Sequence, residues 1–127
     1  MNYRHKVKCS SKVCEIKKHI DNELKEFSKL LDDEELIFEI RLVLNELLIN
    51  ACEHGNKWDA EKCVDYEIII NKDYIKITVQ DEGDGLREIE PYNAKSLESS
   101  GRGIKIVKEL TDDLVLENNK VIAIINL

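Results

Sequence analysis

The most strongly patterned stretch of the chain runs from residue 34 to residue 56, where apolar residues recur at helical spacing. The apolar stripe and the positions that widen it are Leu36, Ile40, Val43, Leu44, Leu47, Leu48, Ala51 and Cys52. A helix that is apolar around so much of its circumference is normally buried. The pattern therefore predicts a central buried helix, which starts at a capping pair formed by Asp32 and Glu35 and stops at Gly55.

Two other segments also show helical periodicity. The first follows a cap at Ser10-Ser11 and runs to about Leu31, and the second spans residues 103–112. Their apolar stripes are formed by Val13, Ile16, Ile20, Leu24, Phe27 and Leu31, and by Ile104, Val107 and Leu110. Each of these helices is expected to bury one face in a common core.

Elsewhere the apolar residues alternate with polar ones, which is the repeat of a strand with one buried face. The predicted strands are residues 3–9, 64–70, 75–79, 114–117 and 121–127. Short polar turns at 71–73 and 118–120 join the last four into two hairpins. Together the elements predict a single domain over residues 1–127, an α+β two-layer α/β sandwich in which three helices lie on one face of a mixed, mostly antiparallel sheet.

Three polar residues interrupt the apolar helix at intervals of four: Glu46, Asn50 and His54. Steps of four place side chains on one line along a helix. Burial of a polar group without a partner costs roughly 2–7 kcal/mol, depending on the reference state. The line is therefore expected either to face a cavity that holds polar ligands or to form a private hydrogen-bond network.

A second polar group follows the strand at 75–79. Asp81 continues the parity of the buried residues of that strand, so its side chain is expected to point toward the core. Buried aspartates are rare unless paired. Gly83 and Gly85 follow, and glycine lets a backbone approach a ligand closely. The alternative is a simple turn capped by Asp81; an EF-hand loop is excluded because Tyr92 stands where its last glutamate would be.

Gly101-Arg102-Gly103 stands at the start of the last predicted helix. The free N–H groups and the dipole of a helix start favour a phosphate, whereas the alternative is an ordinary helix start. The motif is neither a P-loop, since no G-K-[ST] follows, nor a Rossmann fingerprint, since Ile106 replaces the third glycine. The preceding residues 86–100 are polar and lack a period, and they are expected to form a lid.

Composition narrows the classes of partner. The net charge of −7 argues against nucleic acid, because proteins that bind phosphate backbones normally show a basic face. No apolar run reaches the ~18 residues of a membrane span, and residues 1–12 lack the apolar region of a signal peptide, so a cytoplasmic location without a membrane partner is expected. The four cysteines form no C-x-x-C pair and are expected to be free thiols. A zinc site on Cys52, His54 and Cys63 is disfavoured, because the first two point to different helix faces.

The polar motifs are more specific in combination than singly. They comprise a helix pair, a strand end and a glycine pair, in the order Glu46 and Asn50, Asp81, Gly83 and Gly85, Gly101 and Gly103. This combination resembles the Bergerat ATP-binding fold of the GHKL superfamily, which includes gyrase, histidine kinases and related ATPases. Within it, the compact domain and the E-x-x-x-N-x-x-x-H-G string are similar to the anti-sigma-factor serine/threonine kinases of bacteria. The resemblance covers about residues 5–127.

The resemblance implies roles for the matching residues. Glu46 would be the catalytic general base for a serine hydroxyl on a protein substrate, and Asn50 would hold Mg²⁺. Asp81 would accept a hydrogen bond from the amino group of adenine. Phosphoryl transfer needs positioning, a metal and a base, which agrees with this set. The other residues expected to bind ATP are His54, Gly83, Gly85, Lys95, Gly101, Arg102 and Gly103.

The resemblance also implies ATP and Mg²⁺ as cofactors, an anti-anti-sigma protein as substrate, a sigma factor as a second partner, and a homodimer. One departure is that the family often has Gly-Thr at the start of the last strand, where this chain has Asn119-Lys120. Two other functions are compatible with the residues. One is a non-kinase regulatory module of the same fold, which binds protein partners in a nucleotide-dependent way. The other is a structural domain whose polar line only bonds internally.

Overall fold

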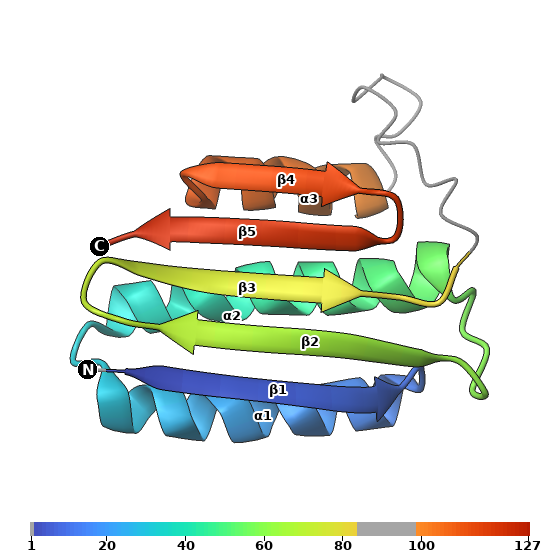
Figure 1. The fold of residues 1–127 in the computed structure, drawn as a ribbon, viewed down its shortest axis with the longest axis horizontal. Coiled ribbons are helices and arrows are strands. Elements are labelled where there is room, and N and C mark those ends of the chain that lie inside the picture. The colour runs from blue at the N-terminus through green and yellow to red at the C-terminus, as the bar shows by residue number, and fades with distance from the viewer. Residues whose placement is uncertain (1, 84–98) are drawn as a thin grey trace.

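The computed structural model describes residues 2–83 and 99–127. Its helices lie on one face of a five-stranded sheet (Figure 1). The strands are β1 (Tyr3–Ser10), β2 (Cys63–Ile70), β3 (Tyr74–Gln80), β4 (Asp113–Glu117) and β5 (Lys120–Asn126). The helices are α1 (Val13–Leu30), α2 (Glu34–Asn50) and α3 (Ser99–Leu110), and α2 continues into a π-helical turn, η1 (Ala51–Gly55). No helix in the described ranges is long and apolar enough to cross a membrane.

The strand order is β1-β2-β3-β5-β4, with β1 and β4 at the edges of the sheet. Every pairing between the described strands is antiparallel, so the expectation of a mixed sheet is wrong, while the predicted α+β two-layer sandwich is confirmed. Both predicted hairpins are present. The β2–β3 turn is closed by Asn71, whose Oδ1 accepts hydrogen bonds from the N–H groups of Asp73 (2.8 Å) and Tyr74 (2.9 Å).

The central helix is buried as its apolar pattern predicts. Its fully or nearly fully buried apolar residues are Ile40, Val43, Leu44, Leu47, Leu48, Ala51 and Cys52. The helix is capped by Asp33 and not by Asp32, because it is the Oδ1 of Asp33 that accepts from the N–H of Leu36, at 3.1 Å. The helical run ends at Gly55 as expected, but its last turn is π-helical, closed by a 2.9 Å bond from the N–H of Asn56 to the carbonyl of Ala51.

The starts of the other two helices also differ from the predictions. Helix α1 begins at Val13, and its N-cap residue is Lys12, which makes no side-chain capping bond. The Ser11 hydroxyl instead donates to the carbonyl of Lys62 at 2.6 Å. Helix α3 begins at Ser99 instead of residue 103, and the end of the lid expected at 86–100 therefore belongs to the helix. The rest of that expected lid lies outside the described residues.

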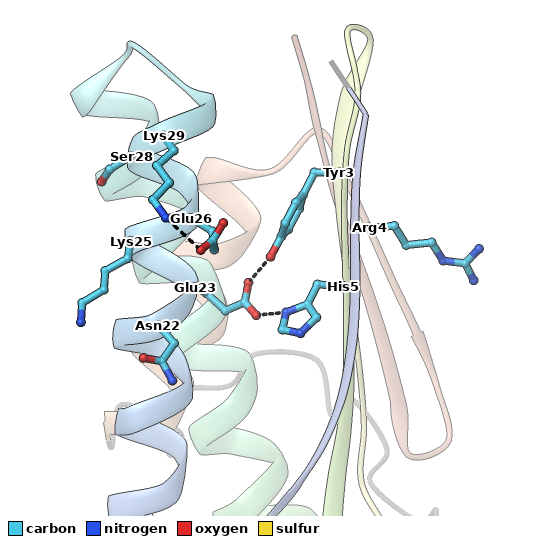
Figure 2. Close-up of a pocket in the computed structure, with 9 residues that line it drawn as sticks. All are labelled: Tyr3, Arg4, His5, Asn22, Glu23, Lys25, Glu26, Ser28 and Lys29. Atoms are coloured by element: carbon cyan, nitrogen blue, oxygen red, sulfur yellow. Dashed lines mark hydrogen bonds and ion pairs between the residues drawn. The ribbon is translucent and has the colours of Figure 1, made fainter.

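A buried carboxylate fastens the edge strand β1 to α1. Glu23 of α1 is 1% exposed and accepts hydrogen bonds from the hydroxyls of Tyr3 (3.0 Å) and Tyr66 (3.2 Å). It also contacts the Nδ1 of His5, and Figure 2 shows Tyr3 and His5 pointing from β1 toward it while Arg4 points away. Burial and the nearby carboxylate raise the pKa of both tyrosines. Tyr3, His5 and Glu23 line an open pocket of about 760 Å³.

Candidate nucleotide-binding site

The polar residues of the central helix lie near its C-terminal end, and α2 and β3 finish at the same end of the sheet (Figure 1). Asn50 is 6% exposed, and its Nδ2 has no hydrogen-bond partner within the described ranges. His54, in contrast, is exposed and lies 3.8 Å from the carboxylate of Glu53. The widened π-helical turn changes the spacing after Asn50, so His54 does not share the buried environment of the line that the sequence predicts.

Glu46 stands one turn before Asn50 on α2 and is partly buried. Desolvation by burial, together with the negative charge of Glu53, raises the pKa of Glu46 above its usual range. A carboxylate with a raised pKa accepts a proton more readily near neutral pH than an exposed one does. Such perturbed groups are common at catalytic sites, although structural carboxylates also show them.

Asp81 follows β3 directly and is 3% exposed, as its parity predicts. Its Oδ1 accepts a 2.8 Å hydrogen bond from the N–H of Gly83, which folds the chain into a tight turn. Its backbone is held from the β4–β5 turn, because Asn119 accepts from the Asp81 N–H at 3.0 Å and donates to the Asp81 carbonyl at 2.6 Å. Asn119, which departs from the Gly-Thr of the resembling family, thus has a positioning contact of its own.

The carboxylate of Asp81 packs directly against Gly55. A Cβ added to Gly55 would lie 2.1 Å from the Asp81 Cγ, and one added to Gly83 would lie 2.6 Å from the Gly55 carbonyl oxygen. Real Cβ atoms do not approach other atoms so closely, so the absence of side chains at both positions makes this packing possible. Gly55 ends the π-helical turn that directly follows Asn50, so the contact brings Asp81 into the neighbourhood of Asn50.

A buried asparagine joins the segments around this turn and was not singled out in the sequence. Asn56 is fully buried and follows Gly55. Its Nδ2 donates to Ser11 Oγ (2.7 Å) and to the Cys63 carbonyl (2.9 Å), and its Oδ1 accepts from the Glu82 N–H at 2.7 Å. The sequence predicts only a polar loop from residue 56 onward, because these partners come from distant segments.

The other residues expected to bind ATP lie in α3 or outside the described residues. Gly101, Arg102 and Gly103 lie within the first turns of α3 and not at its first residue. The side chain of Arg102 is outside what the structure describes, and so are Gly85 and Lys95.

The cysteines show no sign of a metal centre. All four lie in described segments and are free thiols, and Cys9 and Cys52 are buried as small apolar residues. Burial raises the pKa of Cys9 to about 12 and that of Cys52 to about 11, which makes both thiols poor nucleophiles. Within the described ranges no three or more His, Cys, Asp or Glu side chains gather into a metal site.

The residues present are suited to a nucleotide with Mg²⁺. Asn50 supplies a buried amide whose Nδ2, a hydrogen-bond donor, has no partner within the described ranges, and an acceptor such as a phosphate oxygen would complete it. Asp81 supplies a buried acceptor, and the two glycines at 55 and 83 leave backbone with no side chains beside it. An amide oxygen is a normal Mg²⁺ ligand when phosphates and water supply the others.

An antiparallel sheet covered by three helices, with this polar site at the ends of α2 and β3, is consistent with the GHKL-type ATPase fold. Residues 18–125 match the family described as the histidine kinase-like ATPase domain. The chain therefore belongs to the histidine kinase-like ATPase domain family, as the resemblance implied.

Several relatives are named anti-sigma F factor. The anti-sigma F factor of Geobacillus stearothermophilus is 34% identical over 86 residues, which cover 63% of this chain and 59% of that protein. That of Clostridium perfringens is 35% identical over 92 residues, covering 68% and 66%, and that of Bacillus thuringiensis is 30% identical over 92 residues, covering 68% and 63%. The chain thus matches somewhat less than two thirds of the length of these relatives.

Proposed function

We propose that this chain is an ATP-dependent protein-serine kinase that acts as an anti-sigma factor. It would phosphorylate an anti-anti-sigma protein and sequester a sigma factor. The observation that carries the proposal is an arrangement on one helical run. Glu46, with its raised pKa, stands one turn before the buried Asn50, whose Nδ2 has no partner among the described residues, and Asp81 packs against the end of the same run.

Each residue has a role in this proposal. Asn50 holds Mg²⁺ through its amide oxygen, and Asp81 accepts a hydrogen bond from the amino group of adenine. A side chain at Gly83 would collide with Gly55. Without one, the turn stays tight and its backbone can lie beside the nucleotide. The bound Mg-ATP supplies the phosphoryl group and the positive charge that offsets charge developing during transfer. The protein supplies orientation and a base, which are the main requirements for this reaction.

Glu46 is the general base that takes the proton of the serine hydroxyl. The serine Oγ of the partner forms the new O–P bond while the bond from the γ-phosphorus to the bridging oxygen breaks, and ADP leaves with that oxygen. The serine proton passes to the carboxylate of Glu46. Because burial and Glu53 raise the pKa of Glu46, its carboxylate holds that proton more strongly than an exposed glutamate would. A general base of this kind contributes about 10²–10⁴-fold to a rate.

The family resemblance and the relatives' names support the proposed partners. A protein named anti-sigma F factor acts against a sigma factor, and three such relatives align with this chain. We extend the same kind of partner to this chain, together with an anti-anti-sigma protein as phosphate acceptor and a second copy of the chain as a homodimer partner. Action on a sigma factor would place the protein in the cytoplasm.

A radiolabel-transfer assay tests the kinase. The purified chain is mixed with Mg-[γ-³²P]ATP and a candidate anti-anti-sigma protein, and partner and ATP binding are measured in parallel. Glu46→Gln should retain both kinds of binding and lose about 10²–10⁴-fold in transfer rate. Glu39→Gln, which makes the same substitution two turns earlier on α2, is the matched control and should transfer at the wild-type rate.

The outcomes separate the candidate functions. Transfer by wild type that Glu46→Gln abolishes supports the kinase. If wild type binds ATP and its partners but transfers no phosphate, or if Glu46→Gln transfers at the wild-type rate, the kinase is wrong and the regulatory ATP-binding module is the better account. A well-folded wild type that binds neither ATP nor ADP at about 1 mM rules out both.

A further inference from the structure

The carboxamide of Asn56 is the most fully engaged polar side chain near the site. It has zero exposed surface, and both of its N–H donors and its oxygen make hydrogen bonds of 2.7–2.9 Å. The partners come from three segments: Ser11 before α1, Cys63 at the start of β2, and Glu82 directly after Asp81. One side chain therefore joins the end of η1 to the turn that carries Asp81.

The orientation of the Asn56 amide follows from its partners. The Ser11 hydroxyl donates to the Lys62 carbonyl, so it can only accept from Asn56, and the Cys63 carbonyl can only accept as well. Both partners require the nitrogen of the amide, which leaves its oxygen for the N–H of Glu82. A reversed amide would place like groups together at all three contacts, so the network has a single polarity.

Asn56 and Gly55 act on the same turn from adjacent positions. Gly55 is in contact with the Asp81 carboxylate, while Asn56 holds the N–H of the next residue, Glu82. Glu82 is held a second time, since its carboxylate accepts from the N–H of Cys63. The backbone that carries the Asp81 side chain therefore cannot shift along the helix end without breaking the buried bond between Asn56 and Glu82.

We propose that Asn56 is a positioning residue that sets the Asp81 carboxylate against the nucleotide base, and so determines the preference for a purine with a 6-amino group. This inference rests on the proposed nucleotide binding. Asn56 need not touch the nucleotide to do this. Its three bonds fix where the turn after β3 begins, and hydrogen bonding to a base edge is lost when the acceptor moves by a fraction of an ångström to an ångström.

The test compares two probes, Mg-ATP and Mg-purine riboside 5′-triphosphate, which lacks only the 6-amino group. Calorimetry gives the ratio of their dissociation constants. Wild type should prefer ATP by about tenfold to hundredfold, the range expected of one charge-assisted hydrogen bond, and Asp81→Asn gives the ratio without that bond. Asn56→Ala should lower the ratio to near the Asp81→Asn value. A merely structural role would weaken both probes alike and leave the ratio unchanged.

Two further variants serve as a control and as a second test of the network. Asn71→Ala is the matched control, because Asn71 closes the β2–β3 turn at the other end of the sheet; it should lower stability and keep the wild-type ratio. Ser11→Ala removes one acceptor of the Asn56 amide and should lower the ratio part of the way. If Asn56→Ala does not fold, the Ser11→Ala ratio alone decides.

Each outcome has one meaning. If the ratio stays within about twofold of wild type in both Asn56→Ala and Ser11→Ala, the positioning role is wrong while the proposed nucleotide binding stands. The positioning role is also wrong if Asn71→Ala lowers the ratio as much as Asn56→Ala does. A wild type that binds both probes equally also overturns it. A wild type that binds neither probe removes the proposed function itself.

Discussion

Gly55 and Asp81 are in contact, although 26 positions separate them in the chain. A Cβ at Gly55 would lie 2.1 Å from both the Cγ and the Oδ2 of Asp81. The end of the helical run and the end of β3 therefore meet backbone to carboxylate, with no side chain between them. The site that Asp81 belongs to depends on a residue that looks, in the sequence, like an ordinary helix terminator.

We predict that Gly55→Ala displaces the Asp81 carboxylate. The added methyl group overlaps the carboxylate, and overpacking of this kind costs about 1–3 kcal/mol in the free energy of unfolding. Because the acceptor moves, the affinity for ATP should fall by about tenfold or more. Urea unfolding and calorimetry measure the two effects.

A double-mutant cycle with Asp81→Ala isolates the contact. In the Asp81→Ala background the group that the methyl overlaps is gone, so Gly55→Ala should be neutral or slightly stabilising, as expected for alanine in place of helical glycine. A coupling free energy of about 1 kcal/mol or more between the two substitutions supports the contact. Additive effects would mean that Gly55→Ala acts through something else.

The buried cluster around Glu23 leads to a prediction about stability alone. Glu23→Ala leaves the hydroxyls of Tyr3 and Tyr66 without their acceptor and removes the partner of His5. Removing one member of a buried charged group costs about 3–5 kcal/mol, and the half-exposed His5 favours the lower end. Urea unfolding should show this loss, and β1 should lose hydrogen-exchange protection first because it is an edge strand.

Glu26 provides the matched control for that prediction. It lies one turn later on α1 and forms an exposed ion pair with Lys29 at 3.4 Å (Figure 2). Such pairs contribute about 0–1 kcal/mol, so Glu26→Ala should change stability little. Equal losses in the free energy of unfolding for the two variants would show that the buried bonds of Glu23 do not stabilise the fold.

The raised pKa of Glu46 predicts a pH-dependent stability difference. A carboxyl whose pKa is higher in the folded state than its ordinary value of 4.5 keeps its proton in the folded chain after the unfolded chain has lost it. The unfolded state then binds fewer protons, and the free energy of unfolding falls as pH rises from the ordinary to the raised pKa. Glu46→Gln has no such charge to bury and should be the more stable protein at neutral pH.

Melting temperatures at two pH values check the sign. The stabilisation by Glu46→Gln should be present near neutral pH and small at about pH 4, where both the folded and the unfolded wild type hold the proton. Glu39→Gln accounts for the general effect of removing a negative charge from an acidic protein. A difference between Glu46→Gln and Glu39→Gln that grows as pH falls would contradict the assigned cause.

Much of the fold could be predicted from periodicity. The helix around Leu47 and the strand around Ile77 were expected because each repeats its apolar residues with the period of its own backbone geometry. The parity of β3 also placed Asp81 on the buried face, since a side chain that continues a strand's alternation stays on the same side. These signals are local, and they survive in the folded chain because one sheet face and one helix stripe must share a core.

Contacts made between distant segments could not be predicted in this way. Serine is a common helix cap, yet the Ser11 hydroxyl donates to the Lys62 carbonyl and accepts from the Asn56 amide. Asn56 looks like a loop residue, because nothing near it in the chain shows its bonds to Cys63 and Glu82. The π-helical turn was also missed, since a one-residue change in hydrogen-bond spacing leaves the apolar pattern almost intact.

Asn50 carries a prediction in which stability and function move in opposite directions. Its Nδ2 is buried without a hydrogen-bond partner in the described parts of the chain, and such a group costs about 1–3 kcal/mol. Asn50→Leu replaces the amide by an apolar side chain of similar size in an apolar helix. The free energy of unfolding of the nucleotide-free protein should therefore rise by about 1 kcal/mol, or roughly 4 °C in melting temperature.

The same substitution should abolish Mg²⁺-dependent ATP binding, because leucine offers no oxygen to a metal. Melting curves with and without Mg-ATP measure both effects at once: wild type should shift upward with ligand, and Asn50→Leu should not. Asn45→Leu, on an exposed position of the same helix, is the matched control and should keep the ligand shift with a stability change of about 0.5 kcal/mol at most. If Asn50→Leu is destabilised and still shows the wild-type ligand shift, then Asn50 is a structural residue, and the metal-holding role assigned to it is wrong.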